Sequence, residues 1–543
     1  MFFILVLLAA TSLRAQVADL VVENASIHTV DPKNPRARSL AVKDGKFLAV
    51  GNDVSQHIGP ATRRINAQGA ALFPGLIDSH VHLRGLGELL NGLDLRKATS
   101  PEEIAKLVAE RAAQAPKGTW IRGRNWDQAN WGDRMPTSAV LDALVAGHPV
   151  YLSRVDGHAA WVNQRALSLA GITKATQDPD GGHLLRTKDG TPTGVLVDRA
   201  MRLVASKIPG ATDAEVEAAL ERAARQCSRL GLTTVHDAGN SRQELDAYRR
   251  LIAAGRMPLR IYAMVGGEGP LWREYLAKGP EIGESFTVRT VKLFADGAMG
   301  SRGAAFWQPY TDDKSNSGLL LATKEDIARV AKQAVEKGFQ VATHAIGDRA
   351  NTITLQGYAA ALKGKNNRRF RIEHAQVIRL PDFQTFADLD VIASIQSTHA
   401  TSDMRWAQDR LGPDRLLGAW APQRFLKAGA RIANGSDFPV EDPNPLWGVY
   451  AAITRQDHAG NPPGGFMPEQ KLSPLRALES FTIDGAYAAF EENTKGSITP
   501  GKLADFVILD HDILTVEPRQ IITTKVKLTV LGGAVVYDSA MKN

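Results

Sequence analysis

The 543-residue sequence contains a single cysteine, Cys227, so no disulfide bond can form within the chain. It also lacks any run of five or more residues of one charge, and its net charge of +7 is spread along the chain. Scattered basic residues do not form the patch typical of nucleic-acid-binding proteins, so no nucleic-acid partner is expected. We expect Cys227 to pack as a small buried side chain in a helix.

Apolar runs long enough to cross a bilayer are also missing. The N-terminal run from Phe2 to Ala10 is too short for that purpose. Small and polar residues follow it, and Ala15 stands where a signal peptidase would cut. The sequence therefore predicts a signal peptide over residues 1–15, export to the periplasm or the medium, and no membrane span in the mature chain.

What is present is an ordinary globular composition, with 44% hydrophobic and 23% charged residues. A chain of 543 residues is too long for one ordinary core. Its length fits a large α/β barrel with a smaller module beside it.

Both ends of the chain read as short strands separated by turns. Residues 19–72 contain apolar stretches divided by turn sequences such as KDGK, and residues 501–537 repeat this style. Each end is too small to bury a core alone. We expect residues 16–72 and 486–543 to form one composite β-sandwich.

Between the ends, eight apolar segments alternate with helical patterns, which is the signature of a (β/α)8 TIM barrel over residues 73–485. The candidate strands lie within residues 71–83, 232–239, 259–265, 288–297, 339–348, 369–378, 391–398 and 430–440. A long insertion, residues 86–208, separates the first strand from the second. Loops after barrel strands form the mouth of the active site, so this insertion is expected to shape a substrate pocket.

Histidines and other polar residues stand at the ends of these strands. His80 and His82 are two residues apart, so their imidazoles point to the same side of a strand. Lys292, His344 and His374 occupy the corresponding ends of later strands, as does Asp437. Barrel geometry brings such ends into one pocket, and histidine with carboxylate is a ligand set suited to zinc or a similar divalent ion.

Four further residues are weaker candidates for substrate contacts: His158, His236, Asp296 and His399. The alternative for each is a hydrogen-bonded wall residue of the pocket. Trp126, Trp131 and Trp161 could line an apolar pocket, but core packing is the interpretation favoured for them.

Five motifs carry a resemblance to a known family. In order and spacing, FPGLIDSHVH, VKLFADGAMGSR, THAIGDRA, IEHAQ and GSDFPV resemble the amidohydrolase superfamily, specifically the subgroup that includes N-substituted formamide deformylases. The similarity covers nearly the whole chain, including the NWD and DGHAAWVN segments of the insertion.

The resemblance implies a ligand set with one or two divalent metal ions, in which each residue has a role. His80, His82 and Asp437 would bind one ion, with Asp437 also moving protons. His344 and His374 would bind a second ion, and Lys292 would bridge both as a carbamate. The family also contains members with one metal.

A divalent ion lowers the pKa of bound water and polarises a carbonyl, so the predicted reaction is hydrolysis of a non-peptide C–N bond in a small molecule. The same side chains also support ester, lactone or phosphoester hydrolysis, because fold does not decide the substrate. A third alternative is a non-catalytic ligand-binding barrel, against which the intact ligand set argues. A homo-oligomer remains compatible with the sequence.

Overall fold

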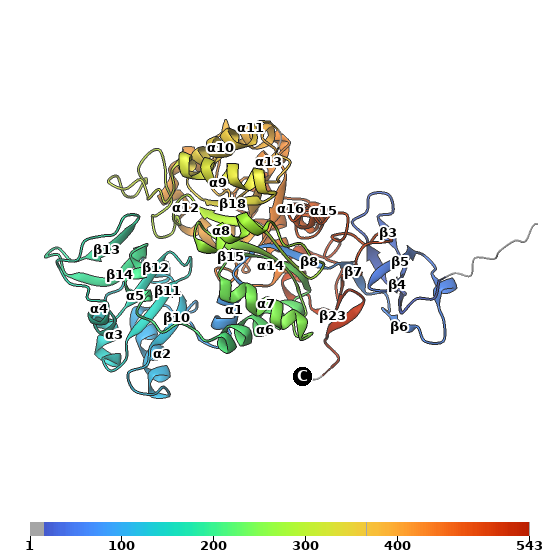
Figure 1. The fold of residues 1–543 in the computed structure, drawn as a ribbon, viewed down its shortest axis with the longest axis horizontal. Helices are drawn as coiled ribbons and strands as arrows, with labels where there is room; N and C mark the ends of the chain where they lie inside the picture. Colours follow the sequence, from blue (N-terminus) through green and yellow to red (C-terminus); the bar gives the residue numbers. More distant parts are fainter. Residues whose placement is uncertain (1–15, 365, 542–543) are drawn as a thin grey trace, which may run out of the picture.

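The computed structural model describes residues 16–364 and 366–541, so the predicted signal peptide lies outside the described residues. The chain forms three parts (Figure 1). A central barrel lies between a β-sandwich built from both chain ends and a separate insertion domain that carries strands β10–β14.

The central sheet has eight parallel strands in the order β21-β20-β19-β18-β17-β16-β15-β8, which confirms the predicted barrel. The strands are β8 (Leu76–Val81), β15 (Leu232–Asn240), β16 (Arg260–Gly266), β17 (Phe286–Phe294), β18 (Gln340–Ala345), β19 (Arg371–His374), β20 (Ile392–Ile395) and β21 (Ile432–Asn434). Five of the eight fall inside the predicted segments, and β15, β16 and β17 extend one or two residues beyond theirs.

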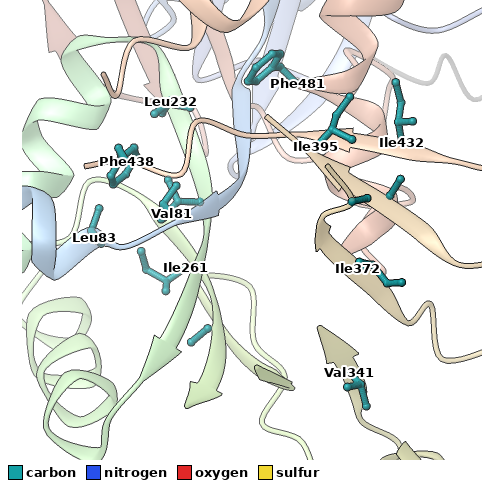
Figure 2. Packing of buried hydrophobic residues seen from close by; sticks show 14 of the residues in the cluster. Val81, Leu83, Leu232, Ile261, Val341, Ile372, Ile395, Ile432, Phe438 and Phe481 are labelled. Carbon is teal, nitrogen blue, oxygen red and sulfur yellow. The ribbon is translucent and has the colours of Figure 1, made fainter. Parts of the chain in front are cut away.

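The barrel is joined between its first and last strands by the segment that follows β21. The Asp437 amide donates to the His80 carbonyl over 2.8 Å, and the His82 amide donates to the Phe438 carbonyl over 2.8 Å. Figure 2 shows side chains from several strands, among them Val81 and Ile372, within the buried core that this closure completes.

Helices follow most barrel strands and pack around them. They are α1 (Leu83–Leu89), α6 (Asp213–Arg229), α7 (Arg242–Ala253), α8 (Pro270–Lys278), α9 (Lys324–Lys337), α10 (Asp348–Leu362), α11 (Asp382–Asp388), α12 (Ser397–Leu416), α13 (Pro422–Ala428), α14 (Pro445–Thr454), α15 (Pro474–Ser480), α16 (Ile483–Ala488) and α17 (Pro518–Thr523). Cys227 is buried on α6, as expected. In the described part of the chain, no helix is both long and apolar enough to cross a membrane.

The two chain ends share a β-sandwich, as predicted. Its sheets have the orders β5-β4-β1-β6 and β24-β23-β22-β7-β2-β3, and β7 pairs with β22 in antiparallel fashion. Apolar side chains from both ends, including Leu72 and Phe506, form one buried cluster. The strands are β1 (Leu20–Glu23), β2 (Ser26–His28), β3 (Arg36–Ala37), β4 (Ser39–Lys43), β5 (Lys46–Gly51), β6 (Arg63–Asn66), β7 (Ala71–Pro74), β22 (Phe506–Leu509), β23 (Val526–Leu531) and β24 (Ala534–Asp538).

The segment predicted as the first barrel strand contains two strands that belong to different parts. β7 lies in the sandwich, and β8 begins the barrel after Gly75. A Cβ atom on Gly75 would stand 2.2 Å from Thr233 Oγ1, so a larger residue would collide with β15. Gly75 therefore lets the chain pass from sandwich to barrel against a neighbouring strand.

The insertion is a folded domain with a six-stranded mixed sheet, β13-β14-β12-β11-β10-β9, where the sequence had suggested only a long insertion. Trp126 and Trp161 are buried in its core with ring centroids 6.3 Å apart, and Trp131 packs against it, as favoured from the sequence. Its elements are β9 (Leu93–Asp94), α2 (Pro101–Ala113), β10 (Ile121–Trp126), α3 (Ser138–Val145), β11 (Val150–Arg154), β12 (Ala159–Val162), α4 (Gln164–Leu169), β13 (Gly182–Arg186), β14 (Pro192–Asp198) and α5 (Met201–Ala205).

Candidate metal centre and active site

A cavity of about 910 Å³ opens at the carboxyl ends of the barrel strands. Barrel residues including Lys292, His344 and Asp437 line one side. The insertion supplies residues such as Arg124 and His158. The insertion therefore shapes the pocket, as its place after the first strand predicted.

Three of the predicted ligands meet at the closure of the barrel. Asp437 Oδ1 lies 3.3 Å from His82 Nε2 and 3.6 Å from His80 Nε2. One ligand atom from each of these residues lies within 4.8 Å of the other two, a spacing that can hold one metal ion.

The hydrogen bonds of these residues leave the correct atoms free for a cation. His80 Nδ1 contacts the Glu373 carboxylate, and His82 Nδ1 donates to the Ala238 carbonyl over 3.1 Å. In both rings the Nε2 lone pair therefore faces Asp437. His80 Nε2 and Asp437 Oδ1 are buried without a hydrogen-bond partner among the described residues. Buried orphan acceptors of this kind fit a bound divalent ion.

The other two histidines lie beside this triad. The ring centroids of His344 and His374 are 4.5 Å apart, and those of His80 and His374 are 5.0 Å apart. His374 Nδ1 bonds Gln396 Oε1 over 2.8 Å. Burial lowers the pKa of His344 and His374 well below the usual value and that of His80 to about 4. The rings are thus neutral at pH 7, which is the form that binds metals.

Lys292 reaches the same cavity from β17. Its Nζ atom lies 4.4 Å from the centroid of the Phe294 ring. Among the described residues, no carboxylate lies within 4.0 Å of this ammonium and no side chain or carbonyl accepts a hydrogen bond from it. Burial lowers the pKa of Lys292 to about 8. An ion-pairing role with Asp296 therefore has no support in the geometry.

Asp437 and His374 hold left-handed backbone conformations, with φ of 59° and 72°. Such values are uncommon outside glycine and cluster at functional sites. Burial by itself would raise the pKa of Asp437, but His82, His80 and His374 hold it well below its usual value. The aspartate is therefore ionised, as a metal ligand must be.

A buried ion network next to the triad was not predicted from the sequence. Glu373 Oε2 accepts from Arg371 Nη2 over 3.0 Å and also contacts His80 Nδ1, while its Oε1 accepts from Arg371 Nε; both charged side chains are fully buried. Arg371 also donates to Ser394 Oγ over 2.6 Å. The RIEH sequence of β19 could have indicated this network. Arg371 and Glu373 are two residues apart on that strand, so both side chains lie on its interior face.

Two of the four weaker candidates line the cavity. His399 Nε2 lies 3.8 Å from Asp437 Oδ2, and His399, His374 and Asp437 form a second group with metal-ligand spacing. His158 stands 5.2 Å from His344, centroid to centroid, and bonds Asp198 Oδ1 over 2.7 Å. Both therefore line the cavity in which a substrate contact was predicted for them.

The other two weaker candidates are buried away from the cavity, contrary to the expectation of substrate contact. His236 is fully buried, accepts from Arg371 Nη1 over 3.0 Å and packs on Tyr262. Asp296 accepts from the amides of Ala305, Ile346 and Gly347 over 2.8 to 3.0 Å. Asp296 therefore joins the loops after β17 and β18, which is the wall-residue alternative.

A parallel barrel with histidines, a lysine and an aspartate around a cavity at its strand ends has the architecture of a metal-dependent barrel hydrolase. The model of the amidohydrolase family matches residues 63–537. The chain belongs to the amidohydrolase family, and the resemblance drawn from its motifs is confirmed.

Relatives of this chain cover almost its full length. The protein LONG AFTER FAR-RED 3 of Arabidopsis thaliana is 36% identical, over 96% of this chain and 92% of its own. The N-substituted formamide deformylase of Arthrobacter pascens is 28% identical, over 96% and 99%. The crystal structure of a metal-dependent hydrolase from Pyrococcus horikoshii OT3 matches with a TM-score of 0.75 and 28% identity, over 92% of this chain and 99% of that one. Together they support a hydrolase.

Proposed function

We propose that this protein hydrolyses a non-peptide C–N bond, as in an amide or formamide, in a small molecule. The observation that carries the proposal is the triad of His80, His82 and Asp437, in which His80 Nε2 and Asp437 Oδ1 are buried with no hydrogen-bond partner in the described part of the chain. A barrel that only bound ligands would not need to bury such atoms without partners.

The residues of the centre divide the chemistry between them. When bound, a divalent cation supplies Lewis acidity, which acidifies water and polarises the substrate carbonyl. Asp437 is ionised and stands at the cavity edge, so it can take the proton of the attacking water and return it to the leaving amine. That proton matters because an amine leaves poorly in its unprotonated form. Glu373 keeps His80 oriented by accepting a hydrogen bond from its Nδ1 atom.

Zinc is the metal that we propose, because imidazole nitrogen and carboxylate oxygen are ligands that zinc prefers. The first ion has the complete triad described above. A second ion would use His344 and His374 with Lys292 as a bridging carbamate. His399 has metal-ligand spacing with His374 and Asp437, so it is an alternative ligand for this second ion.

The similarity to the N-substituted formamide deformylase of Arthrobacter pascens supports a C–N substrate. Esters, lactones and phosphoesters use the same kind of centre, so the experiment compares substrate classes. We expect purified protein to contain one or two divalent ions per chain, to hydrolyse N-formyl amines and to lose this activity on chelation, with recovery when zinc is returned. Metal-free protein with full activity, or a panel in which esters or phosphoesters alone are hydrolysed, would refute the proposal.

We also propose that the protein is exported and that the mature chain begins near Gln16. The apolar run that ends at Ala10 and the small residue Ala15 support this assignment. Mass spectrometry of the native protein tests it, because an intact N-terminus in a cytosolic fraction would contradict export.

A further inference from the structure

The arginines on the cavity wall differ in whether their side chains are already bonded to other groups of the protein. Five of the six described there are engaged. Arg84 and Arg122 bond Glu88, Arg154 and Arg405 bond Asp127, and Arg96 donates to the Pro439 carbonyl. These five are held by groups of the chain itself, so their charges are already balanced or bonded.

Arg124 is the exception. Among the described residues, its guanidinium makes no hydrogen bond and no ion pair, and its Nε atom is buried without a partner. Glu88, whose negative charge acts on Arg124, already bonds Arg84 and Arg122 over 2.8 and 3.2 Å. Arg124 is half-buried and only its Nε is removed from water, so its two terminal nitrogens, which have no partner among the described residues, are free to bind a ligand in the cavity.

The position of Arg124 places that ligand beside the metal triad. A Cβ atom built on Gly85 would stand 3.5 Å from Arg124 Nη1 and 3.2 Å from Pro439 Cδ. Gly85 is three residues after His82, and Pro439 is two residues after Asp437. The guanidinium therefore reaches the side of the cavity formed by the start of α1 and the segment after β21.

The backbone of Arg124 is held within the sheet of the insertion domain. It belongs to β10, where it pairs with Ser153 of β11 on one side and Asp94 of β9 on the other. Arg122 stands two residues earlier on the same face of β10, so both side chains line the cavity. A central strand fixes the backbone from which the Arg124 side chain extends into the cavity.

We propose that Arg124 binds a carboxylate of the substrate, so that the preferred substrates are N-acyl compounds with a carboxylate close to the scissile C–N bond. This inference rests on the proposed function and names its substrate class. The planar guanidinium offers two parallel donors, which match the two oxygens of a carboxylate. A phosphate presents three oxygens and would need further donors, yet the neighbouring arginines are occupied.

Hydrolysis and binding are measured on matched pairs that differ in one carboxylate. N-formylphenylalanine and N-formylphenethylamine are the substrates, and their N-methanesulfonyl analogues, which cannot be hydrolysed, are the binding probes. The zinc-loaded protein is compared with Arg124→Met and with Arg122→Met. Arg122 is the control because it shares the strand and the cavity wall but is 51% exposed and bonded to Glu88.

We expect the acid to exceed its neutral twin in kcat/KM and in affinity by roughly 10- to 100-fold, the range of a charge-assisted hydrogen bond. This preference should disappear in Arg124→Met and persist in Arg122→Met. Equal binding of the two sulfonyl probes by the wild type, or a preference that survives Arg124→Met, would overturn the inference. If the sulfonyl acid is preferred but neither formamide is hydrolysed, the proposed reaction fails and the carboxylate site stands.

Discussion

Lys292 is the residue whose chemical form most affects the centre. An ammonium cannot ligate a cation, whereas a carbamate formed from the neutral amine and carbon dioxide carries two bridging oxygens. Burial lowers the pKa of Lys292 to about 8, so a useful fraction is neutral near pH 7. We predict that Lys292→Ala lowers kcat/KM by about 100-fold or more and loses part of the metal, and that added acetate or propionate restores some of both.

The matched control is Lys292→Arg, which keeps the positive charge but cannot form a carbamate. It should be as inactive as Lys292→Ala and should not respond to carboxylates. An active Lys292→Arg protein with full metal content would contradict the carbamate.

His80 sets the acid limit of metal binding. Burial is the main cause that lowers its pKa to about 4, below the usual value of 6.5. A lowered histidine pKa means that protons compete with the metal only at lower pH. We predict that occupancy of the triad stays constant from about pH 8 to pH 6 and falls as the pH approaches about 4. The metal content of the protein is measured after dialysis at each pH in this range. A midpoint of metal loss near the ordinary histidine pKa would show that burial does not protect His80 from protonation.

At the scale of elements, one aspartate joins two barrel loops. Asp296 follows β17 and accepts three backbone amides from the loops after β17 and β18, within 3.0 Å. We predict that Asp296→Ala lowers the free energy of unfolding by about 3 to 5 kcal/mol, because it leaves three buried N–H groups without acceptors. Urea denaturation measures this loss. A stable Asp296→Ala protein with a raised KM would instead indicate a substrate contact.

At the scale of the whole molecule, a buried ion pair joins the barrel to the sandwich. Arg260 of β16 donates from Nε to Asp505 Oδ2 over 2.7 Å and from Nη2 to Oδ1 over 3.0 Å. We predict that Arg260→Met destabilises the protein by about 3 to 5 kcal/mol, because it leaves the Asp505 charge buried and unpaired. The double variant Arg260→Met/Asp505→Asn should recover part of this loss in the same denaturation assay. A double variant as unstable as the sum of its two single variants would show that the pair is not coupled.

The sequence by itself determined the barrel, the composite sandwich and the family. Hydrophobic runs of strand length alternating with helical patterns are local signals, and each of the eight barrel strands overlaps its predicted segment. The spacing of His80 and His82 also needed no structure, because two residues apart on a strand means one shared side.

The tertiary structure decided which polar side chains meet. Asp296 and His236 had the same strand-end signature as His344, yet both are buried away from the cavity because backbone amides and Arg371 hold them. The pairing of Glu373 with Arg371 and His80 depends on side chains that come from different strands. Arg124 is distinguished from Arg122 by the absence of a described partner, not by residue type. Local patterning fixes which face a residue occupies, but its partners come from segments distant in the chain, and the folded backbone alone brings those together.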